Sequence, residues 1–171
     1  MKRFLILVCA MCLLVCVCGC GGSSSSKGSK TEKIITTTAK SNTSSSSEGE
    51  VGQPVKAGDL TVTVLSWQMQ DELDTLKPEK VGDKYVVADC EVSNNGTAPV
   101  ESSYGDFSIR TPEGYQYRAF DYSGYNPRYP DATIDPQGKS RGGVTIEVPG
   151  STTSMVLEFS NDQSRAKIKL Q

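Results

Sequence analysis

The stretch Asp59-Leu-Thr-Val-Thr-Val-Leu-Ser-Trp67 decides the fold class of this chain. Leu60, Val62 and Val64 alternate with threonines, which is the period-two pattern of a β-strand with one buried face. The stretch Tyr85-Val-Val-Ala-Asp-Cys-Glu-Val-Ser93 repeats the pattern, and a turn with an Asn-Gly pair follows it. Helical periodicity is almost absent elsewhere, so we expect an all-β fold.

Further short runs with the same alternation follow, separated by Gly, Pro, Asn and Asp residues. We expect strands at 107–110, 115–120, 134–139 leading into 143–148, 155–159 and 166–170. Seven to eight short strands with frequent turn signals are typical of an immunoglobulin-like antiparallel β-sandwich. A closed barrel is the structural alternative, and the segment Asp71 to Lys80 is compatible with a helical turn at one end of the sandwich.

Residues 1–19 have the layout of a lipoprotein signal peptide. Lys2 and Arg3 precede an apolar run from Phe4 to Cys18, and the segment closes with Val17-Cys18-Gly19-Cys20. As a helix the run would span about 22 Å, which is short of a hydrocarbon core of about 30 Å. The closing tetrapeptide resembles the lipobox of bacterial lipoproteins. The resemblance implies that Cys20 is lipidated and holds the mature protein to the extracytoplasmic side of the cell membrane.

Residues 20–50 read as a lipid-anchored flexible linker, because half of the thirty residues after Cys20 are Ser or Thr. Such a composition buries too little apolar surface to offset the entropy of ordering, so we expect a disordered spacer. The 121 residues from 51 to 171 are enough for one compact domain with its own core. We therefore expect the folded domain to span residues 51–171.

The number of available cysteines falls once the signal peptide is removed. Four of the six leave with it and Cys20 would carry lipid, which leaves Cys90 alone and unable to form an internal disulfide. Cys90 shares one face of its strand with Val86, Ala88 and Val92. We expect it to be a small apolar filler of the core.

The composition excludes several classes of catalytic site and of partner. The chain has no histidine, which removes Ser-His-Asp and Cys-His nucleophiles and the usual zinc sites. A carboxylate pair would still permit a hydrolase, and the acidic candidates are Asp106, Glu113, Asp121, Asp131 and Asp135. We expect each of them to be a solvated turn residue. No long basic patch is present, so we expect no nucleic-acid partner.

A second group of acids lies at Asp71-Glu-Leu-Asp74, with Asp83 beyond it. Calcium takes six to eight oxygen ligands, and this spacing does not match a calcium loop. We expect a solvated charge cluster, and we expect neither a metal nor a cofactor in the protein.

The most distinctive loop is Phe120-Asp-Tyr-Ser-Gly-Tyr-Asn-Pro-Arg-Tyr-Pro-Asp131, in which tyrosines alternate with small and polar residues. Tyrosine gives a large contact area with a polar tip, so this composition is typical of binding loops. One hypothesis makes Tyr122, Tyr125, Arg128 and Tyr129 an interaction surface. The alternative is that the loop folds over a sheet edge, with its tyrosines forming a small core.

The order of the landmarks resembles a family of bacterial lipoproteins with a telokin-like, immunoglobulin-type domain of unknown function (domain-of-unknown-function family 4352). The matching segments are Gly58–Val64, Tyr85–Gly96, Phe107 before Pro112–Tyr115, Pro136-Gln-Gly138 and Gly143–Pro149. The resemblance covers nearly all of residues 51–171 and implies an immunoglobulin-like sandwich outside the cell with no assigned reaction. One departure is Gln137, since the family pattern usually reads Pro-Gly at this turn.

These observations lead to an expected function. We expect a membrane-anchored, non-catalytic binding or adhesion module at the cell envelope, with an envelope protein or a wall polymer as its partner. A structural or accessory envelope lipoprotein without its own ligand is the alternative, and a carboxylate-based hydrolase is a more distant one. The oligomeric state is not predicted.

Overall fold

The computed structural model describes residues 47–74, 76–122, 127–162 and 164–171, all within one compact unit, Ser41–Gln171. The predicted signal peptide, Cys20 and most of the predicted linker lie outside the described residues. The elements, in chain order, are β1 (Ser47–Glu50), β2 (Val55–Ala57), β3 (Leu60–Gln70), β4 (Asp83–Asn94), β5 (Val100–Ser102), a 3₁₀ turn η1 (Tyr104–Asp106), β6 (Phe107–Arg110), β7 (Gln116–Phe120), β8 (Ala132–Ile134), β9 (Lys139–Pro149), β10 (Met155–Ser160) and β11 (Arg165–Leu170). The all-β prediction is confirmed.

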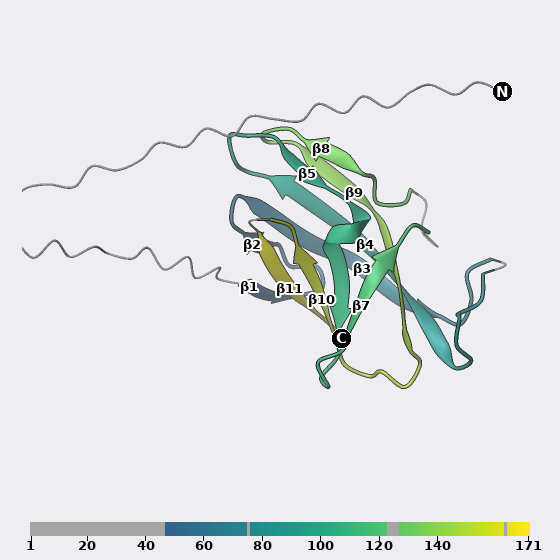
Figure 1. Ribbon diagram of the computed structural model, residues 1–171. Coiled ribbons are helices and arrows are strands. Elements are labelled where there is room, and N and C mark those ends of the chain that lie inside the picture. Colours follow the sequence, from purple (N-terminus) through teal and green to yellow (C-terminus); the bar gives the residue numbers. More distant parts are fainter. Residues whose placement is uncertain (1–46, 75, 123–126, 163) are drawn as a thin grey trace, which may run out of the picture. The chain divides into compact units, whose positions relative to one another are not determined.

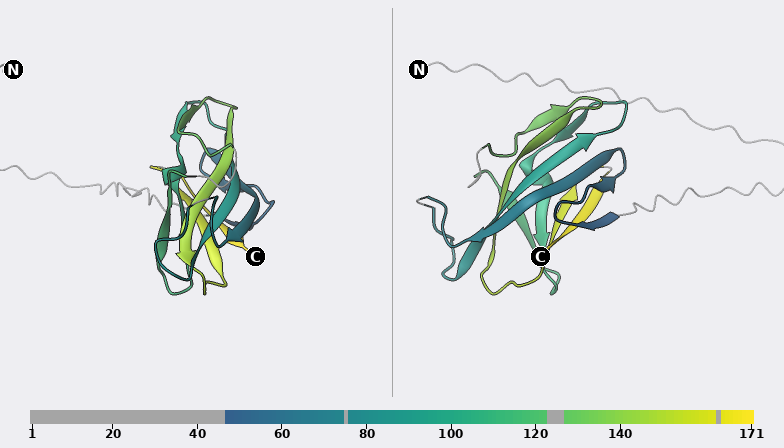
Figure 2. Two further views of the ribbon diagram at one scale, coloured as in Figure 1. Left: turned by 90° about the vertical axis from the view of Figure 1, so that its right-hand side faces the viewer. Right: turned by 180° about the vertical axis from the view of Figure 1, so that it is seen from behind.

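The strands form a two-layer sandwich (Figures 1 and 2). Layer A contains β1, β11, β10 and β6, and layer B contains β9, β4, β3 and β2. Strand β7 joins the two layers, because it pairs with β6 through residues 116–118 and with β9 through residues 119–120. The hydrogen-bonded order therefore runs from β1 to β2 as one folded sheet, and β5 pairs with β8 in a separate ribbon.

The long strands follow the alternation seen in the sequence. Leu60, Val62 and Val64 of β3 are all buried, as are the even-numbered residues from Val86 to Val92 of β4. A β-bulge at Leu65 then shifts the register of β3 against β4. Because of this extra residue, Trp67 and Met69 turn towards the core and Leu65 is exposed.

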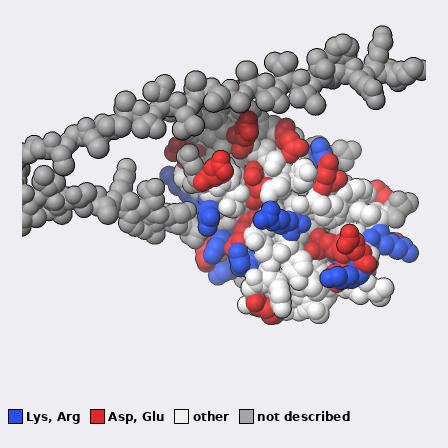
Figure 3. Space-filling view, viewed as in Figure 1, with Lys and Arg blue, Asp and Glu red and all other residues white. Residues whose placement is uncertain are grey.

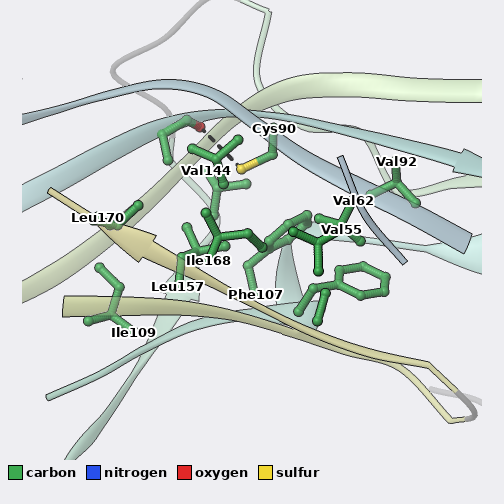
Figure 4. Close-up of a cluster of buried hydrophobic side chains, with 14 of the residues drawn as sticks. Val55, Val62, Cys90, Val92, Phe107, Ile109, Val144, Leu157, Ile168 and Leu170 are labelled. Carbon is green, nitrogen blue, oxygen red and sulfur yellow. Dashed lines mark hydrogen bonds between the residues drawn. The ribbon is translucent and has the colours of Figure 1, made fainter. Parts of the chain in front are cut away.

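Most buried apolar side chains lie between the layers and form the main core (Figure 4). Cys90 is a buried free thiol in this core, and its Sγ lies 3.8 Å from the carbonyl oxygen of Ala88. Burial raises the pKa of the Cys90 thiol, so it stays protonated and unreactive. The prediction that Cys90 fills the core is confirmed.

A second apolar cluster lies on the outer face of layer B and is called the outer cluster below. Its buried members are Leu73, Tyr85 and Val87, and its half-buried members are Leu76, Phe120 and Tyr122. The odd-numbered residues of β4 therefore do not face water at this end of the strand. The segments before β4 and after β7 cover them.

The structure corrects two expectations about local elements. The segment compatible with a helical turn, 71–80, has no helix among its described residues; Leu73 and Leu76 instead exchange backbone hydrogen bonds of 2.9 and 2.7 Å. This tight turn places Leu73 in the outer cluster. In addition, β1 begins at Ser47 and pairs in parallel with β11, so the described sheet starts four residues before the predicted boundary at 51.

Eleven strands are described, against seven to eight expected. The four unforeseen strands, β1, β2, β5 and β8, have only three or four residues, which leaves few positions in which alternation can be recognised. The turn at Pro136, where Gln137 departs from the family pattern, has the backbone conformation of a standard β-turn. Gly138 N–H bonds Asp135 O at 2.8 Å, and Gln137 has a φ of 64°, the arrangement of a type II turn in which glycine is usual.

Candidate functional site

An open groove of about 1300 Å³ lies at the end of the sandwich where the β5–β8 ribbon projects. Five parts of the chain form it: the β2–β3 turn, the β4–β5 loop, the ribbon itself, η1 and the β10–β11 turn. The lining is mostly polar. It includes Asp59, Asn94, Glu101, Ser102, Asp106, Asp131, Asp162 and Arg165.

Asn94 holds one wall of the groove in place. Its fully buried side-chain amide donates to the carbonyls of Ala98 at 2.8 Å and Ile134 at 2.9 Å, and its Oδ1 accepts the Gly96 N–H at 2.9 Å. These bonds tie the β4–β5 loop to β8. A Cβ at Gly96 would lie 3.0 Å from the Asp59 side chain, so the close approach of the two turns favours glycine there.

The floor of the groove is connected to the main core through two hydroxyl groups. Ser102 lines the groove and is only 4 % exposed, and its Oγ lies 2.9 Å from the Tyr129 hydroxyl below it. Asp106 accepts a 2.8 Å hydrogen bond from the Ser103 N–H, which closes a capping box on η1. The wall and floor are therefore held by specific hydrogen bonds.

The groove carries a strong excess of negative charge. Five carboxylates line it, from Asp59, Glu101, Asp106, Asp131 and Asp162, and a single cation, Arg165, accompanies them. Burial raises the pKa of Asp106, while hydrogen bonds from Ser103 and Ser102 oppose that shift, and the charges of Asp162 and Asp131 add to it. Figure 3 shows acidic side chains gathered at this end of the molecule, over the ribbon.

The four residues predicted as an interaction surface are not brought together as one. Tyr129 is fully buried in the main core, with its ring edge-on to Phe107 at 5.0 Å between centroids, so the prediction that it is a surface residue is wrong. Backbone bonds to β9 turn it inward, since Tyr129 N–H donates to Gly143 O at 2.8 Å. A Cβ on Gly142 would lie 2.4 Å from the Tyr129 nitrogen, so this contact requires glycine at 142.

The other three residues have different positions. Tyr122 is half-buried in the outer cluster, where its hydroxyl donates to Asp74 Oδ2 at 3.1 Å. Arg128 is exposed, forms an ion pair with Asp121 and lies over the Tyr104 ring at 5.8 Å. Tyr125 lies outside the described residues. The alternative hypothesis, that the tyrosines of this loop form one small core, is also not met, because Tyr122 and Tyr129 belong to two separate clusters.

The acidic candidates divide between the groove and other places. Asp106 and Asp131 line the groove, whereas Glu113 lies in the exposed β6–β7 turn, Asp121 pairs with Arg128 and Asp135 lies in the β8–β9 turn. In the part of the chain that the structure describes, no three acidic, histidine or cysteine side chains are arranged to hold a metal ion.

The predicted solvated cluster before β4 makes contacts across the loop. Asp71 lies 3.0 Å from Lys84, Asp74 accepts from Tyr122, and Glu72 lies 4.0 Å from Lys77. Asp71 and Glu72 stay largely exposed, as expected of a solvated charge cluster, and among these three carboxylates only Asp74 contacts a side chain of the outer cluster.

Sequence reasoning did not find the groove, because its lining residues come from distant segments and each segment reads as an ordinary turn. The sequence carries one usable signal, Asn94-Asn95-Gly96, and by itself that signal predicts only a turn. The fully buried Asn94 shows that this turn also positions the groove wall.

The chain was compared with protein families, with curated proteins and with solved structures. The model of a family described as a domain of unknown function (DUF4352) matches residues 49–168. No curated protein matches the chain. Among the described residues, no helix has the length and apolar composition that crossing a membrane requires.

Several solved structures share the fold at low sequence identity. One is ycdA, a candidate lipoprotein of Bacillus subtilis, with a TM-score of 0.57 and a sequence identity of 15%. The match covers 68% of this chain but only 38% of the ycdA chain. The yjhA protein of Bacillus subtilis has a TM-score of 0.56 and a sequence identity of 16%, and the match covers 72% of this chain and 99% of that chain. The secreted protein MPT63 of Mycobacterium tuberculosis has a TM-score of 0.51 and a sequence identity of 18%, and the match covers 74% of this chain and 98% of that chain. At these identities the likeness concerns the fold.

Proposed function

The chain belongs to the DUF4352 family of domains of unknown function, and on that premise we propose that it is a non-catalytic binding module of the cell envelope. The groove at the end of the sandwich is its recognition surface, and an envelope protein or a wall polymer is its ligand. The observation that carries this proposal is the concave acidic surface itself, which five parts of the chain build and the buried Asn94 holds.

The proposed location is the extracytoplasmic side of the cell membrane, with the protein anchored by lipid on Cys20. The basic start, the apolar run and the lipobox-like Val17-Cys18-Gly19-Cys20 support it. The appearance of this fold in a candidate lipoprotein and in a secreted protein is in agreement with it. Two or more acyl chains would anchor the protein stably.

Two features of the groove favour binding of a macromolecule. Its volume of about 1300 Å³ exceeds the 300–1,000 Å³ of typical small-molecule pockets, and it is open along the end of the sandwich. Its carboxylates would attract a cationic part of a ligand and slow the approach of an anionic one. A protein segment or a polymer with positive groups fits such a surface.

The same carboxylates have roles that do not require catalysis. Asp106 caps η1 through Ser103, which explains its half-buried position. The chain has no histidine to serve as a base, and its one thiol in the domain, Cys90, is buried. We therefore propose a binding role, and we expect purified protein to release no reducing ends from wall polysaccharide, with Asp106→Asn equal to the wild type.

The direct test is capture from native envelope extract, with the immobilised unit 41–171 as bait and mass spectrometry and sugar analysis as readouts. The binding variant is Glu101→Lys with Asp131→Lys, since both side chains are exposed and both line the groove. The matched control is Glu72→Lys with Glu79→Lys, which makes the same change in net charge in the exposed loop before β4.

We expect the wild type and the control to capture the same molecule and the groove variant to lose it, with unchanged melting curves for all three. Equal capture by the groove variant would remove the groove from the proposal. Capture of nothing by the wild type would favour the alternative of a structural envelope lipoprotein without a ligand.

A further inference from the structure

We propose that β3 pairs with β3 of a second copy of this chain, edge to edge and antiparallel, so that layer B continues from one copy into the next. This contact is separate from the groove and goes beyond the proposed recognition function. The part of β3 concerned is residues 66–70, called the free edge below. In the right-hand view of Figure 2, β3 is the long blue strand in front.

The free edge has a partner strand on one side only. Strand β2 pairs with β3 at residues 60–62, and the Val64 carbonyl still accepts the Gly52 N–H at 2.8 Å. Beyond that point β3 pairs with β4 alone, up to Gln70 opposite Tyr85, in the part of the chain that the structure describes. A sheet edge with unpaired backbone groups is a template for another strand.

The bulge at Leu65 determines which backbone groups point outward. Before the bulge, the Val64 carbonyl points away from β4, towards Gly52. In an antiparallel strand the N–H and C=O of one residue point to the same side, and successive residues alternate. One inserted residue reverses this order, so beyond it Trp67 and Met69 direct these groups to the open side. Four backbone groups are therefore available, and an extended chain can pair with all of them.

The free edge lacks the charged residues that usually protect an edge strand. No residue of β3 is charged, whereas the short edge strands β1 and β2 carry Glu48, Glu50 and Lys56. Proteins prevent edge-to-edge association by short length, by charge and by bulges. Of these devices β3 has only the bulge, which ends before residue 66, and Leu65 beside it is 38% exposed.

A second copy matches the free edge in charge and in length. Residues 41–171 contain 12 basic and 19 acidic residues, so two copies repel each other over most of their surface. At the uncharged free edge, two copies can approach without placing like charges opposite each other. Of the described strands, those that end the two sheets offer three or four residues each, whereas the free edge matches itself with five.

A two-fold axis at Gln68 gives a register that suits both faces of the sheet. Trp67 of each copy then lies opposite Met69 of the other, and these two residues exchange backbone hydrogen bonds. Their side chains are half-buried on the core side and would cover each other in an aromatic–sulfur contact. On the outer side Ser66 lies opposite Gln70, and Gln68 lies opposite its own copy. Hydroxyl and amide groups in such positions hydrogen-bond across the strands.

The test measures the average mass of the unit 41–171 by sedimentation equilibrium as the protein concentration rises, in low and in high salt. This unit contains every described residue and the whole main core. Five residues a side make a small interface, so we expect association between about 10 μM and 1 mM protein. Because the net charges of the copies oppose it, association should strengthen with salt.

The variants place a charge on the two-fold axis. Gln68→Lys and Gln68→Glu each put two like charges directly opposite each other, at an exposed position outside the core. An equimolar mixture of the two variants puts opposite charges there instead. The matched control is Gln116→Lys, at an exposed glutamine of β7 that is paired with Arg110 of β6. Circular dichroism checks that all three variants fold.

We expect the wild type to approach the mass of two copies and each Gln68 variant alone to associate about fivefold more weakly or worse. The mixture of the two should associate as well as the wild type. Gln68→Lys lowers the negative net charge, so its weaker association would not be a general effect of charge. Gln116→Lys should associate at least as well as the wild type.

Hydrogen exchange gives a second measurement that needs no variant. The amides of Trp67 and Met69 should exchange about tenfold more slowly at the highest protein concentration than at the lowest. The Lys56 amide lies on the open side of β2 by the same alternation and should not change.

A mass of one copy at about 1 mM protein would overturn the proposal. So would a dimer that Gln68→Lys leaves intact, or a mixture of the two variants that fails to associate, because the contact would then lie elsewhere. Protection of the Trp67 and Met69 amides by envelope extract, with the protein itself a monomer, would assign the free edge to another protein and overturn it too. Gln68 does not line the groove, so none of these results bears on capture there.

Discussion

The main core and the outer cluster use similar side chains for different purposes. The main core lies between two layers and joins strands that are distant in sequence, such as β4 and β11. The outer cluster covers one end of the outer face of layer B and consists of two local segments folded onto β4. We therefore expect the main core to determine global stability and the outer cluster to determine the order of the loops that carry Tyr122 and Asp74.

Replacing Phe107 with alanine is expected to have the largest effect. Phe107 is fully buried, and its ring packs against Tyr129 at 5.0 Å and Phe159 at 5.2 Å. The cavity should cost about 3–5 kcal/mol of unfolding free energy. Urea denaturation followed by circular dichroism measures it. A loss below 1 kcal/mol would contradict the assignment of this aromatic group to the centre of the core.

Replacing Leu73 with alanine is expected to cost about 2 kcal/mol, the low end for a buried leucine, and to act locally. Leu73 is 2% exposed, yet it contacts only the outer cluster. Hydrogen exchange should show faster opening of the amides of Leu73 and Leu76, while protection in the centre of β4 is retained. Loss of protection throughout β4 would mean that the two clusters unfold as one unit.

Replacing Tyr129 with phenylalanine tests the hydroxyl contact between the core and the groove. Loss of the 2.9 Å bond to Ser102 should cost about 1 kcal/mol. Exposed Tyr115→Phe is the matched control and should cost nothing measurable. Equal melting temperatures of the wild type and Tyr129→Phe would show that the hydroxyl bond contributes no stability.

The same variant gives a pH signature. Burial raises the pKa of Tyr129 to about 12, from 10 for a free tyrosine. Since the neutral form is favoured in the folded state, its contribution is fully present below pH 10 and is lost as the pH rises towards 12. The slope is about 1.4 kcal/mol per pH unit. The stability difference between wild type and Tyr129→Phe should decrease over this range, and a constant difference would contradict the buried position.

Replacing Tyr122 with phenylalanine is expected to have the smallest effect. Its ring stays in the outer cluster beside Phe120, and the hydroxyl loses a 3.1 Å bond to Asp74 and a longer 3.4 Å contact to the Leu73 carbonyl at a half-exposed position. We expect at most about 0.5 kcal/mol of destabilisation. A thermal melt and the exchange rate of the Leu73 amide measure it, and a cost as large as that of Leu73→Ala would make the hydroxyl the main fastening of the loop.

The elements differ in how far they could be predicted. The long strands β3, β4 and β9 were predicted from alternation alone, because one face of each is buried and the other was read as polar. The same reasoning failed where an outer face is also covered, as at Tyr85 and Val87, since alternation does not say what packs on the second face. Alternation also did not predict the bulge at Leu65, because one inserted residue moves every later side chain of the strand to the opposite face.

The candidate site was less predictable than the fold. The tyrosine loop was chosen for composition, yet Tyr129 proved to be core and Tyr122 to be part of a loop fastening. The groove residues Asp59, Glu101 and Asp162 could not be predicted from the sequence, because each is an ordinary turn or strand-edge acid in its own segment.

The sequence by itself determined the all-β class, the long strands, the buried role of Cys90 and the absence of histidine chemistry. These features depend on local periodicity and on residue counts, which need no knowledge of distant contacts. The tertiary structure alone decided which tyrosines are buried and where five carboxylates form one groove. Those features arise when turns and strands far apart in the chain are brought side by side, so no single segment contains them.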